Sequence, residues 1–163
     1  MPPQPSRPVV RPARAEDLAA LQELARRTID ARYRSFLGDE GVDWFLDSGA
    51  SDDHVDSHLR KGHVQCMEVD GRLVGLTILD GPTVDLMMID ASRHRRGLGR
   101  ALLSHAEETL FARYEAIRLE SFVDNTAANA FYAACGWSVA GPLDAEGPAK
   151  VELVKHRSAA DAV

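Results

Sequence analysis

The chain has 163 residues, of which 45% are hydrophobic and 27% charged, and its formal net charge is -6. This length supports one full-sized hydrophobic core but not two ordinary domains. The acidic balance excludes general nucleic-acid binding, which needs clustered positive charge. No apolar run approaches the ~18 residues needed to cross a bilayer, and the first residues lack the pattern of a signal peptide. We therefore expect one cytoplasmic domain without a nucleic-acid or membrane partner.

The first half of the chain predicts a strand, helices and a hairpin. We expect a flexible proline-rich tail over residues 1–8, a strand at residues 9–11, and then an amphipathic helix with Leu18, Leu21, Leu24 and Ile29 on its apolar face. Residues 32–47 and 52–60 are expected to be helical or looped. Two apolar runs, residues 63–69 and 73–79, flank an Asp70-Gly71 turn and predict an antiparallel hairpin.

The most informative segment is a basic turn at residues 92–103, SRHRRGLGRALL, which follows a strand-like run at residues 84–89. Gly97 and Gly99 let the backbone approach a ligand, and the unpaired N–H groups of a helix's first turn point toward it. Positive charge is added by Arg95, Arg96 and Arg100. The segment predicts a phosphate-binding turn, and an ordinary basic helix start is the alternative. It matches neither a Walker loop nor a dinucleotide fingerprint.

The second half predicts two more helices and three strands. Leu98, Leu102, Ala106 and Leu110 form the buried stripe of the helix after the turn, and residues 117–123 form a strand. A helix at residues 125–135 is expected to stop at Gly136. The last strands lie at Val139 and at residues 151–154, separated by a loop at residues 141–148, and residues 158–163 form a flexible tail. This order predicts an α+β fold, with a mixed sheet of about six to seven strands and helices on both faces.

A second motif lies at residues 119–137, LESFVDNTAANAFYAACGW, where Asn125, Ala128, Phe131, Tyr132 and Gly136 recur at helical spacing. Together with the glycine turn, it resembles the GNAT superfamily of N-acetyltransferases over roughly residues 8–157. The resemblance implies the GNAT fold for a domain at residues 9–157 and acetyl-CoA as co-substrate. Two residues depart from the family pattern: His94 replaces the usual Gln or Arg, and Trp137 replaces the usual Phe.

The resemblance also implies which residues bind acetyl-CoA. The pyrophosphate would be cradled by the turn, with Arg95, Arg96, Gly97, Leu98, Gly99 and Arg100. The pantetheine arm would pair, like an added strand, with the main chain of Met87, Met88 and Ile89. Asn125 would contact the cofactor as well as cap its helix, and Tyr132 would lie beside the thioester.

Acetyl transfer to an amine also needs an acid and a base. Tyr132 is the candidate acid, because a phenol of pKa ~10 can protonate a thiolate whose conjugate thiol has a pKa of ~8.5. Glu120 is the first candidate for the base. It stands twelve residues before Tyr132, a spacing similar to that of the RimI-type ribosomal-protein alanine acetyltransferases. Asp85, on the preceding strand, is the reserve candidate.

The cysteines and histidines are expected to be structural. Cys66 and Cys135 stand near no activating group in the sequence, so we interpret both as packing residues. His54 and His58 have the spacing that places two metal ligands on one helical face. They lie in an aspartate-rich run that is typical of a solvated face, and no third ligand stands beside them in the sequence. We therefore expect no metal site.

These observations predict an acetyl-CoA-dependent N-acetyltransferase in which a deprotonated amine attacks the thioester directly. A carboxylate base suits an α-amine of pKa ~8 better than a lysine of pKa ~10.4, which favours a peptide or protein N-terminus as acceptor. A small-molecule amine is the alternative acceptor, and a catalytically inactive CoA-binding module is the alternative from another class. Residues 29–60 and 141–148 are expected to set acceptor specificity. A homodimer is left open.

Overall fold

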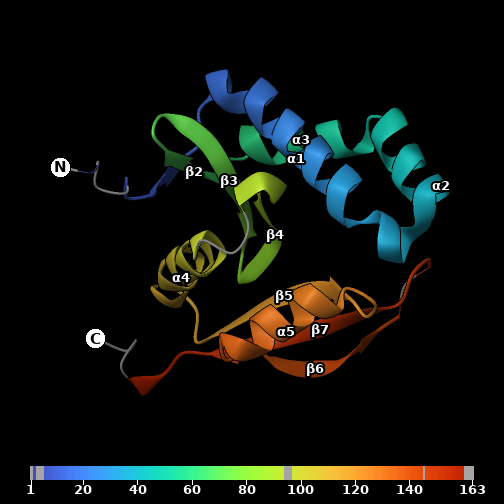
Figure 1. Ribbon diagram of the computed structural model, residues 1–163. Helices are drawn as coiled ribbons and strands as arrows, with labels where there is room; N and C mark the ends of the chain where they lie inside the picture. Colours follow the sequence, from blue (N-terminus) through green and yellow to red (C-terminus); the bar gives the residue numbers. More distant parts are fainter. Residues whose placement is uncertain (1, 3–5, 94–96, 145, 160–163) are drawn as a thin grey trace.

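The computed structural model describes residues 2, 6–93, 97–144 and 146–159. A 7-stranded sheet with the strand order β1-β2-β3-β4-β5-β7-β6 runs through the molecule (Figure 1). Its strands are β1 Val9–Pro12, β2 Val64–Val69, β3 Arg72–Asp80, β4 Thr83–Ile89, β5 Ala116–Phe122, β6 Ser138–Leu143 and β7 Lys150–His156. The α-helices are α1 Leu18–Arg32, α2 Arg34–Asp47, α3 Ala50–Arg60, α4 Leu98–Phe111 and α5 Thr126–Ala134. The predicted α+β architecture is confirmed.

Helices α1 and α3 pack on one face of β2, β3 and β4, and α2 packs against both of these helices. The predicted apolar face of α1 is buried at Leu21, Leu24 and Ile29, which form one core with Leu76 and Ile78 of β3. The segment after α1, expected to be helical or looped, forms a second helix, α2, bent at Gly38, where φ is 76° and ψ is 162°. Asp70 and Gly71 both have positive φ, 53° and 74°, as a tight hairpin turn between β2 and β3 requires.

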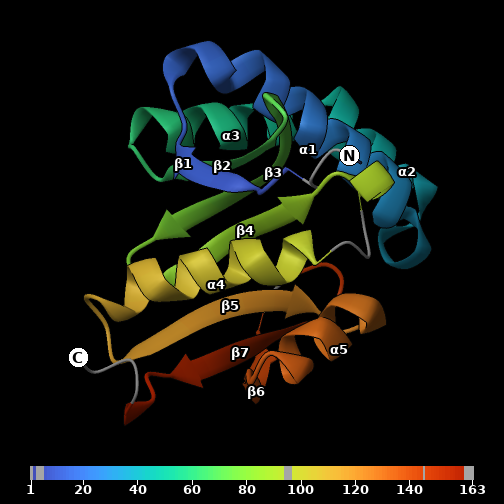
Figure 2. The same ribbon diagram turned by 60° about the vertical axis from the view of Figure 1, so that its left-hand side comes forward.

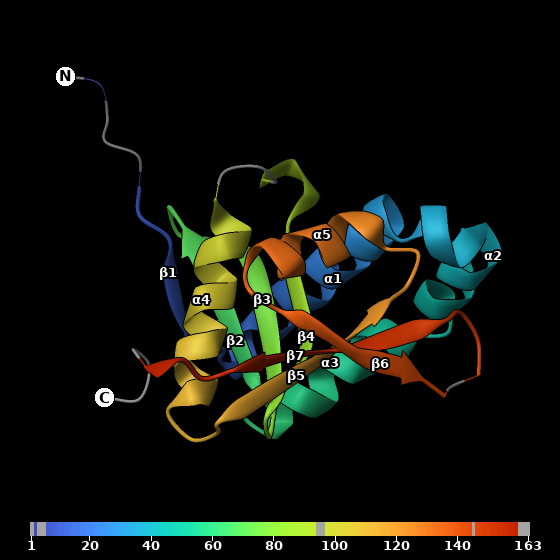
Figure 3. The same ribbon diagram turned by 90° about the horizontal axis from the view of Figure 1, so that it is seen from below.

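The second half of the sheet consists of β5, β7 and β6, seen from below in Figure 3, with β6 at the edge. Helix α4 packs on β3, β4 and β5, and its Leu103 and Ala106 share one core with Phe131 of α5. Leu98 is only half-buried, so the predicted stripe of α4 begins at Leu102. Helix α5 ends before Gly136, whose φ is 90°, as predicted.

One predicted boundary is wrong. The glycine and proline at residues 141–142 were expected in a loop, but β6 continues through them to Leu143, and Pro142 lies opposite Val151 of β7. An edge strand tolerates proline because one side of the strand makes no ladder hydrogen bonds. Within the described ranges, no helix has the length and apolarity needed to span a membrane.

The sheet opens between its two central parallel strands. Strands β4 and β5 are paired at Thr83 and Arg118, and among the described residues their ladder contains no further pair. Strand β4 carries a bulge at the same place: Leu79 pairs with Val84 and Ile78 with Leu86, so Asp85 has no partner on β3. A bulge bends its strand. Figure 2 shows the carboxyl ends of β4 and β5 apart, with the amino end of α4 at the same end of the molecule.

Candidate active site

The opening between β4 and β5 offers a strand edge to an extended ligand. Residues 86–88 have no ladder partner on their β5 side within the described chain, although they pair with β3 on the other. Met88 and Ile89 are 4% and 7% exposed, so their side chains belong to the core while the strand edge stays available. An amide-bearing chain laid along this edge would satisfy these main-chain groups. The residues present therefore fit the expected pantetheine arm.

Gly97 begins α4 in the left-handed conformation, with φ 74° and ψ 3°. Residues with a Cβ rarely adopt this conformation, which explains glycine here. No side chain among the described residues caps α4, so the N–H groups of its first turn remain available to an anion. A Cβ built at Gly97 has no atom within 4 Å, so the backbone is open to close approach. These features fit a pyrophosphate. Arg95 and Arg96, predicted to contribute charge, lie outside the described residues, as does His94.

Gly99 is the point at which three sequence-predicted segments meet. A Cβ at Gly99 would lie 3.6 Å from Cζ of Phe131 on α5 and 4.0 Å from Cγ1 of Ile89 at the end of β4. The fold therefore brings the glycine turn, the strand edge and the asparagine-tyrosine motif to one place. The exposed first-turn residue Arg100 adds positive charge at this helix end.

The segment that leads into the turn is braced from α1. Arg27 Nη2 donates to Asp90 Oδ2 at 2.8 Å, and Asp90 Oδ1 accepts from the main-chain N–H of Ser92 at 3.1 Å. Sequence reasoning did not single out Arg27 or Asp90. Their pairing depends on residues 63 positions apart, and no local pattern signals such a contact.

Two asparagines organise the amino end of α5, one by capping the helix and one by bonding to the end of β5. Asn125, predicted as the cap, accepts a hydrogen bond from Ala128 N at 3.4 Å. Asn129, which sequence reasoning missed, donates to the carbonyl oxygens of Phe122 and Val123 and accepts from Ser121 Oγ at 2.5 Å. A second asparagine one turn after a helix cap was the available signal, because an amide inside a helix usually has a specific partner.

The side chain of Tyr132, on α5, lies beside two other aromatic rings. Its ring centre lies 5.5 Å from that of Phe131 and 6.2 Å from that of Trp137. Burial raises the pKa of Tyr132 well above its usual value, and the nearby Tyr33 phenol adds to the rise. Burial likewise raises the pKa of Tyr33 to about 12. Both phenols therefore keep their protons at neutral pH, which is the state that a proton donor needs.

Glu120 lies on β5, two residues before Phe122. Because side chains alternate along a strand, the Glu120 and Phe122 side chains point to the same face of the sheet. Its side chain is 56% exposed, and its Oε2 lies 3.8 Å from Lys150 Nζ on β7. Phe122 packs against Tyr33 and Phe36, with ring-centre distances of 6.5 and 5.4 Å. This aromatic group joins the α1–α2 junction to β5, beside the predicted base.

The carboxylate of Asp85, the reserve candidate for the base, is hydrogen-bonded to a histidine of α3. Its Oδ2 lies 2.6 Å from Nε2 of His54, and this hydrogen bond lowers the pKa of Asp85. The prediction that His54 and His58 share a solvated face is wrong for His58, which is 8% exposed. The expectation that these two histidines have no third potential ligand beside them is also wrong, because in the folded chain the bulge in β4 brings Asp85 next to both.

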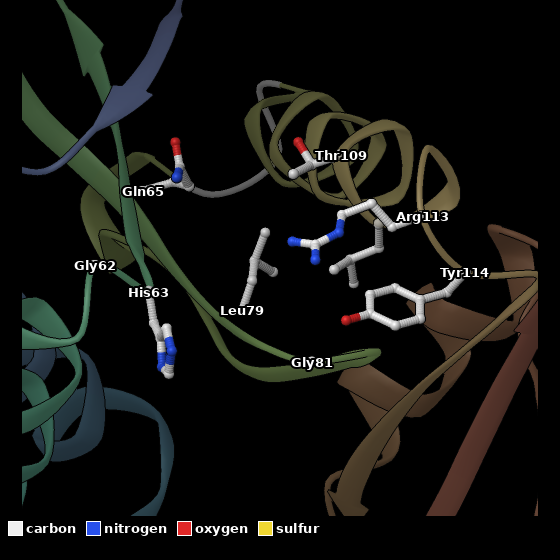
Figure 4. A pocket seen from close by; sticks show the side chains of 9 residues that line it. Gly62, His63, Gln65, Leu79, Gly81, Thr109, Arg113 and Tyr114 are labelled. Carbon is white, nitrogen blue, oxygen red and sulfur yellow. The ribbon is translucent and has the colours of Figure 1, made fainter.

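A separate pocket of about 190 Å³ lies at the far end of α4, lined in part by Gln65, Thr109, Arg113 and Tyr114. Figure 4 shows Arg113 and Tyr114 on one side of it and Gln65 on the other. Among the described residues, its lining includes none of those predicted for acetyl-CoA or catalysis. It is therefore distinct from the opening between β4 and β5.

Solved structures with the same fold cover nearly the whole chain. A GCN5-related N-acetyltransferase from Rhodopseudomonas palustris superposes with a TM-score of 0.82 at 20% identity, covering 94% of this chain and 98% of that chain. The PaiA N-acetyltransferase from Thermoplasma acidophilum, in complex with coenzyme A, gives 0.78 at 18% identity, with 93% and 99% covered. A ribosomal-protein-alanine N-acetyltransferase from Brucella melitensis gives 0.69 at 19%, with 91% and 99% covered. No curated protein sequence matches significantly.

The sequence itself matches the acetyltransferase (GNAT) family over residues 20–137. That range includes the β4 edge, the glycine turn of α4 and the asparagine-tyrosine motif of α5. The chain therefore belongs to the acetyltransferase (GNAT) family, as an N-acetyltransferase with acetyl-CoA as its co-substrate.

Proposed function

We propose that the chain acetylates a primary amine, and specifically the N-terminal amine of a peptide or protein. The observation that carries the proposal is the convergence of Ile89, Gly99 and Phe131 at the opening between β4 and β5, with Tyr132 on the same helix. The pyrophosphate grip is assigned to the main chain of the turn and to its arginines. The pantetheine contacts are assigned to the main chain of Met87, Met88 and Ile89.

Glu120 is proposed as the base. Its exposed carboxylate accepts a proton from the acceptor ammonium, directly or through water, and the neutral amine then attacks the thioester carbonyl. Tyr132 donates its proton to the departing sulfur. A carbon–nitrogen bond forms and the carbon–sulfur bond breaks, so the products are an amide and a free thiol. No covalent enzyme intermediate is involved.

The choice of an N-terminal amine rests on two supports. An α-amine is partly neutral near pH 7, so an ordinary carboxylate is a sufficient partner for its proton, whereas a lysine would demand a much stronger base. Glu120 also stands on an open strand face rather than in an enclosed cavity, which suits the end of a longer chain. The similar fold of a ribosomal-protein-alanine N-acetyltransferase is compatible with this acceptor.

A thiol-release assay with acetyl-CoA tests the proposal. The acceptor panel contains peptides with free N-termini, the same peptides blocked by N-acetylation, peptides with a lysine but a blocked N-terminus, and small amines. We expect turnover with the free N-termini alone. Turnover only with small amines would overturn the peptide acceptor. Binding of acetyl-CoA without turnover on any amine would overturn catalysis in favour of a CoA-binding module.

A further inference from the structure

Five histidine and aspartate side chains converge on the face of the sheet that α3 covers. His54 and His58 lie one turn apart on α3, with ring centres 4.7 Å apart. His63 precedes β2, Asp80 ends β3, and Asp85 occupies the bulge of β4. Two sets of three potential ligand atoms lie within 4.8 Å of one another: His54, His58 and Asp85 form one, and His58, His63 and Asp80 form the other.

We propose that His54 Nε2, His58 Nε2 and Asp85 Oδ2 bind one divalent transition-metal ion, with Zn²⁺ as the best-fitting cation. Two imidazoles and one carboxylate suit zinc and its neighbours, whereas magnesium and calcium prefer oxygen ligands alone. Three protein ligands leave a fourth tetrahedral position for water. The proposal concerns a site separate from the residues assigned to acetyl transfer above.

The distances between the ligand atoms fit such an ion. Zinc–nitrogen bonds of ~2.0 Å in a tetrahedral site place neighbouring ligand atoms ~3.3 Å apart. Asp85 Oδ2 lies 2.6 Å from His54 Nε2 and 4.0 Å from His58 Nε2, on either side of that value. One ligand atom from each of the three residues lies within 4.8 Å of the others, so the side chains are close enough to share one ion. Binding of the ion displaces the proton that His54 and Asp85 now share.

The environment of His58 prepares it as a ligand. Its Nδ1 lies 3.0 Å from Nδ1 of His63, and we assign the proton of this contact to His58, which leaves His58 Nε2 with a free lone pair toward Asp85. The buried ring of His58 therefore has one nitrogen held by a neighbouring histidine and the other turned toward a carboxylate, which is the arrangement of a metal-ligating imidazole. His63 thus acts as a positioning residue, because a metal-bound histidine usually donates its other N–H to a partner.

The bulge in β4 is the second independent support. Without the extra residue, strict alternation along the strand would turn the side chain at position 85 to the face opposite Leu86. The bulge instead places Asp85 with Leu86 on the side of α3. The side chains of His54 and Asp85 are 42% and 30% exposed, so an ion can reach the site from solvent.

The alternative set is less suited to an ion. The carboxylate of Asp80 is 56% exposed at the end of its strand, and it lies 4.0 Å from His63 Nδ1. A flexible exposed carboxylate loses more side-chain entropy on ordering than the bulge-held Asp85. Asp80→Asn therefore serves as the control that separates the two sets.

Titration of the untagged full-length chain with ZnCl₂, after EDTA treatment and dialysis, tests the proposal by calorimetry. Substitution with Co²⁺ adds visible d–d bands that report nitrogen ligation in a four-coordinate site. We expect one Zn²⁺ per chain and at least about a tenfold weaker affinity in His54→Ala and in Asp85→Asn. His63→Ala should weaken the affinity by about 10-fold to 100-fold with the stoichiometry retained. His156→Ala, an exposed histidine at the end of β7, and Asp80→Asn should bind as the native chain does.

Native affinity no tighter than that of His54→Ala would overturn the site. A loss of binding in Asp80→Asn with unchanged binding in Asp85→Asn would overturn this ligand set in favour of the other. His54 is half-exposed, so its variant should fold even if a His58 variant does not, and circular dichroism verifies this. Because zinc binding is measured without acetyl-CoA or an amine, the result stands apart from the acetyl-transfer assay.

Discussion

Lys150 Nζ lies 3.8 Å from Glu120 Oε2 on the neighbouring strand, and 5.0 Å from the ring centre of Phe122. The Lys150 and Glu120 side chains are 35% and 56% exposed, and an exposed pair of this kind contributes at most about 1 kcal/mol to stability. Loss of the Glu120 charge should therefore leave the fold intact. Kinetic defects in a Glu120 variant then report on the reaction rather than on unfolding.

Glu120→Gln should lower kcat/KM by about 10²-fold to 10⁴-fold near pH 7, because the variant cannot take the acceptor proton. The defect should shrink at high pH, where the acceptor amine is already neutral. The measurement is the pH profile of thiol release. Glu152→Gln is the matched control, since Glu152 lies directly opposite Glu120 on β7. A change of less than about threefold in Glu120→Gln, or a pH-rescued defect in Asp85→Asn, would contradict the assignment.

Tyr132→Phe should lower kcat by about 10²-fold to 10⁴-fold with little change in acetyl-CoA affinity, because the hydroxyl is needed only as the thiolate departs. Unlike Glu120→Gln, this variant should gain nothing at high pH. The pKa of Tyr132 is raised above 10, so ionisation of this phenol should produce no fall in native kcat between pH 7 and 10. Tyr114→Phe, at the far pocket, is the control. A native-like kcat in Tyr132→Phe would remove the proton-donor role.

Gly97→Val should weaken acetyl-CoA binding by about tenfold or more, measured by calorimetry on the folded variant. A β-branched residue is strained by roughly 1–2 kcal/mol at φ 74° and also blocks the approach of a pyrophosphate. Gly71→Val is the matched control, because Gly71 has the same φ of 74° and equally open surroundings in the β2–β3 turn. Equal acetyl-CoA affinity in the two variants would show that the pyrophosphate does not bind at the amino end of α4.

Cys66 should resist alkylation in the folded chain. It is 0% exposed, and burial raises the pKa of its thiol to about 11, so only about one molecule in a thousand carries the thiolate at pH 8. Cys135 is half-buried and serves as the internal control. Iodoacetamide treatment followed by mass spectrometry should show modification at Cys135 first, with Cys66 reacting only after denaturation. Equal rates at both thiols would contradict a rigidly packed β2.

The elements that the sequence predicts well are those with a local physical signal. Period-3.6 apolar residues identify α1 and α4, the Asp70-Gly71 pair identifies the β2–β3 turn, and Gly136 identifies the end of α5. The two motifs at the amino ends of α4 and α5 are also local. Their meeting at Gly99 and Phe131 follows from the family resemblance rather than from either segment alone.

The features that the sequence does not predict depend on contacts between distant segments. The bulge at Asp85 arises from the register of β4 on β3, so the approach of Asp85 to His54, 31 residues away, has no local signal. The aromatic contact of Phe122 with Tyr33 and Phe36 likewise joins α1, α2 and β5. Pro142 lies within β6 although a proline usually breaks a strand, and this exception depends on its place at the sheet edge.

Among the described residues, β4 and β5 pair at Thr83 and Arg118 alone, so few backbone hydrogen bonds join two units of the sheet, β1 to β4 and β5 to β7. Local opening of one unit does not require rupture of a ladder in the other, so amide hydrogen exchange should differ in rate between β2–β3 and β5–β7. A ligand that pairs with the exposed edge of β4 replaces the missing rungs. We therefore expect occupation of the opening to couple the two units, so that the chain unfolds more nearly as one body with its co-substrate bound than without it.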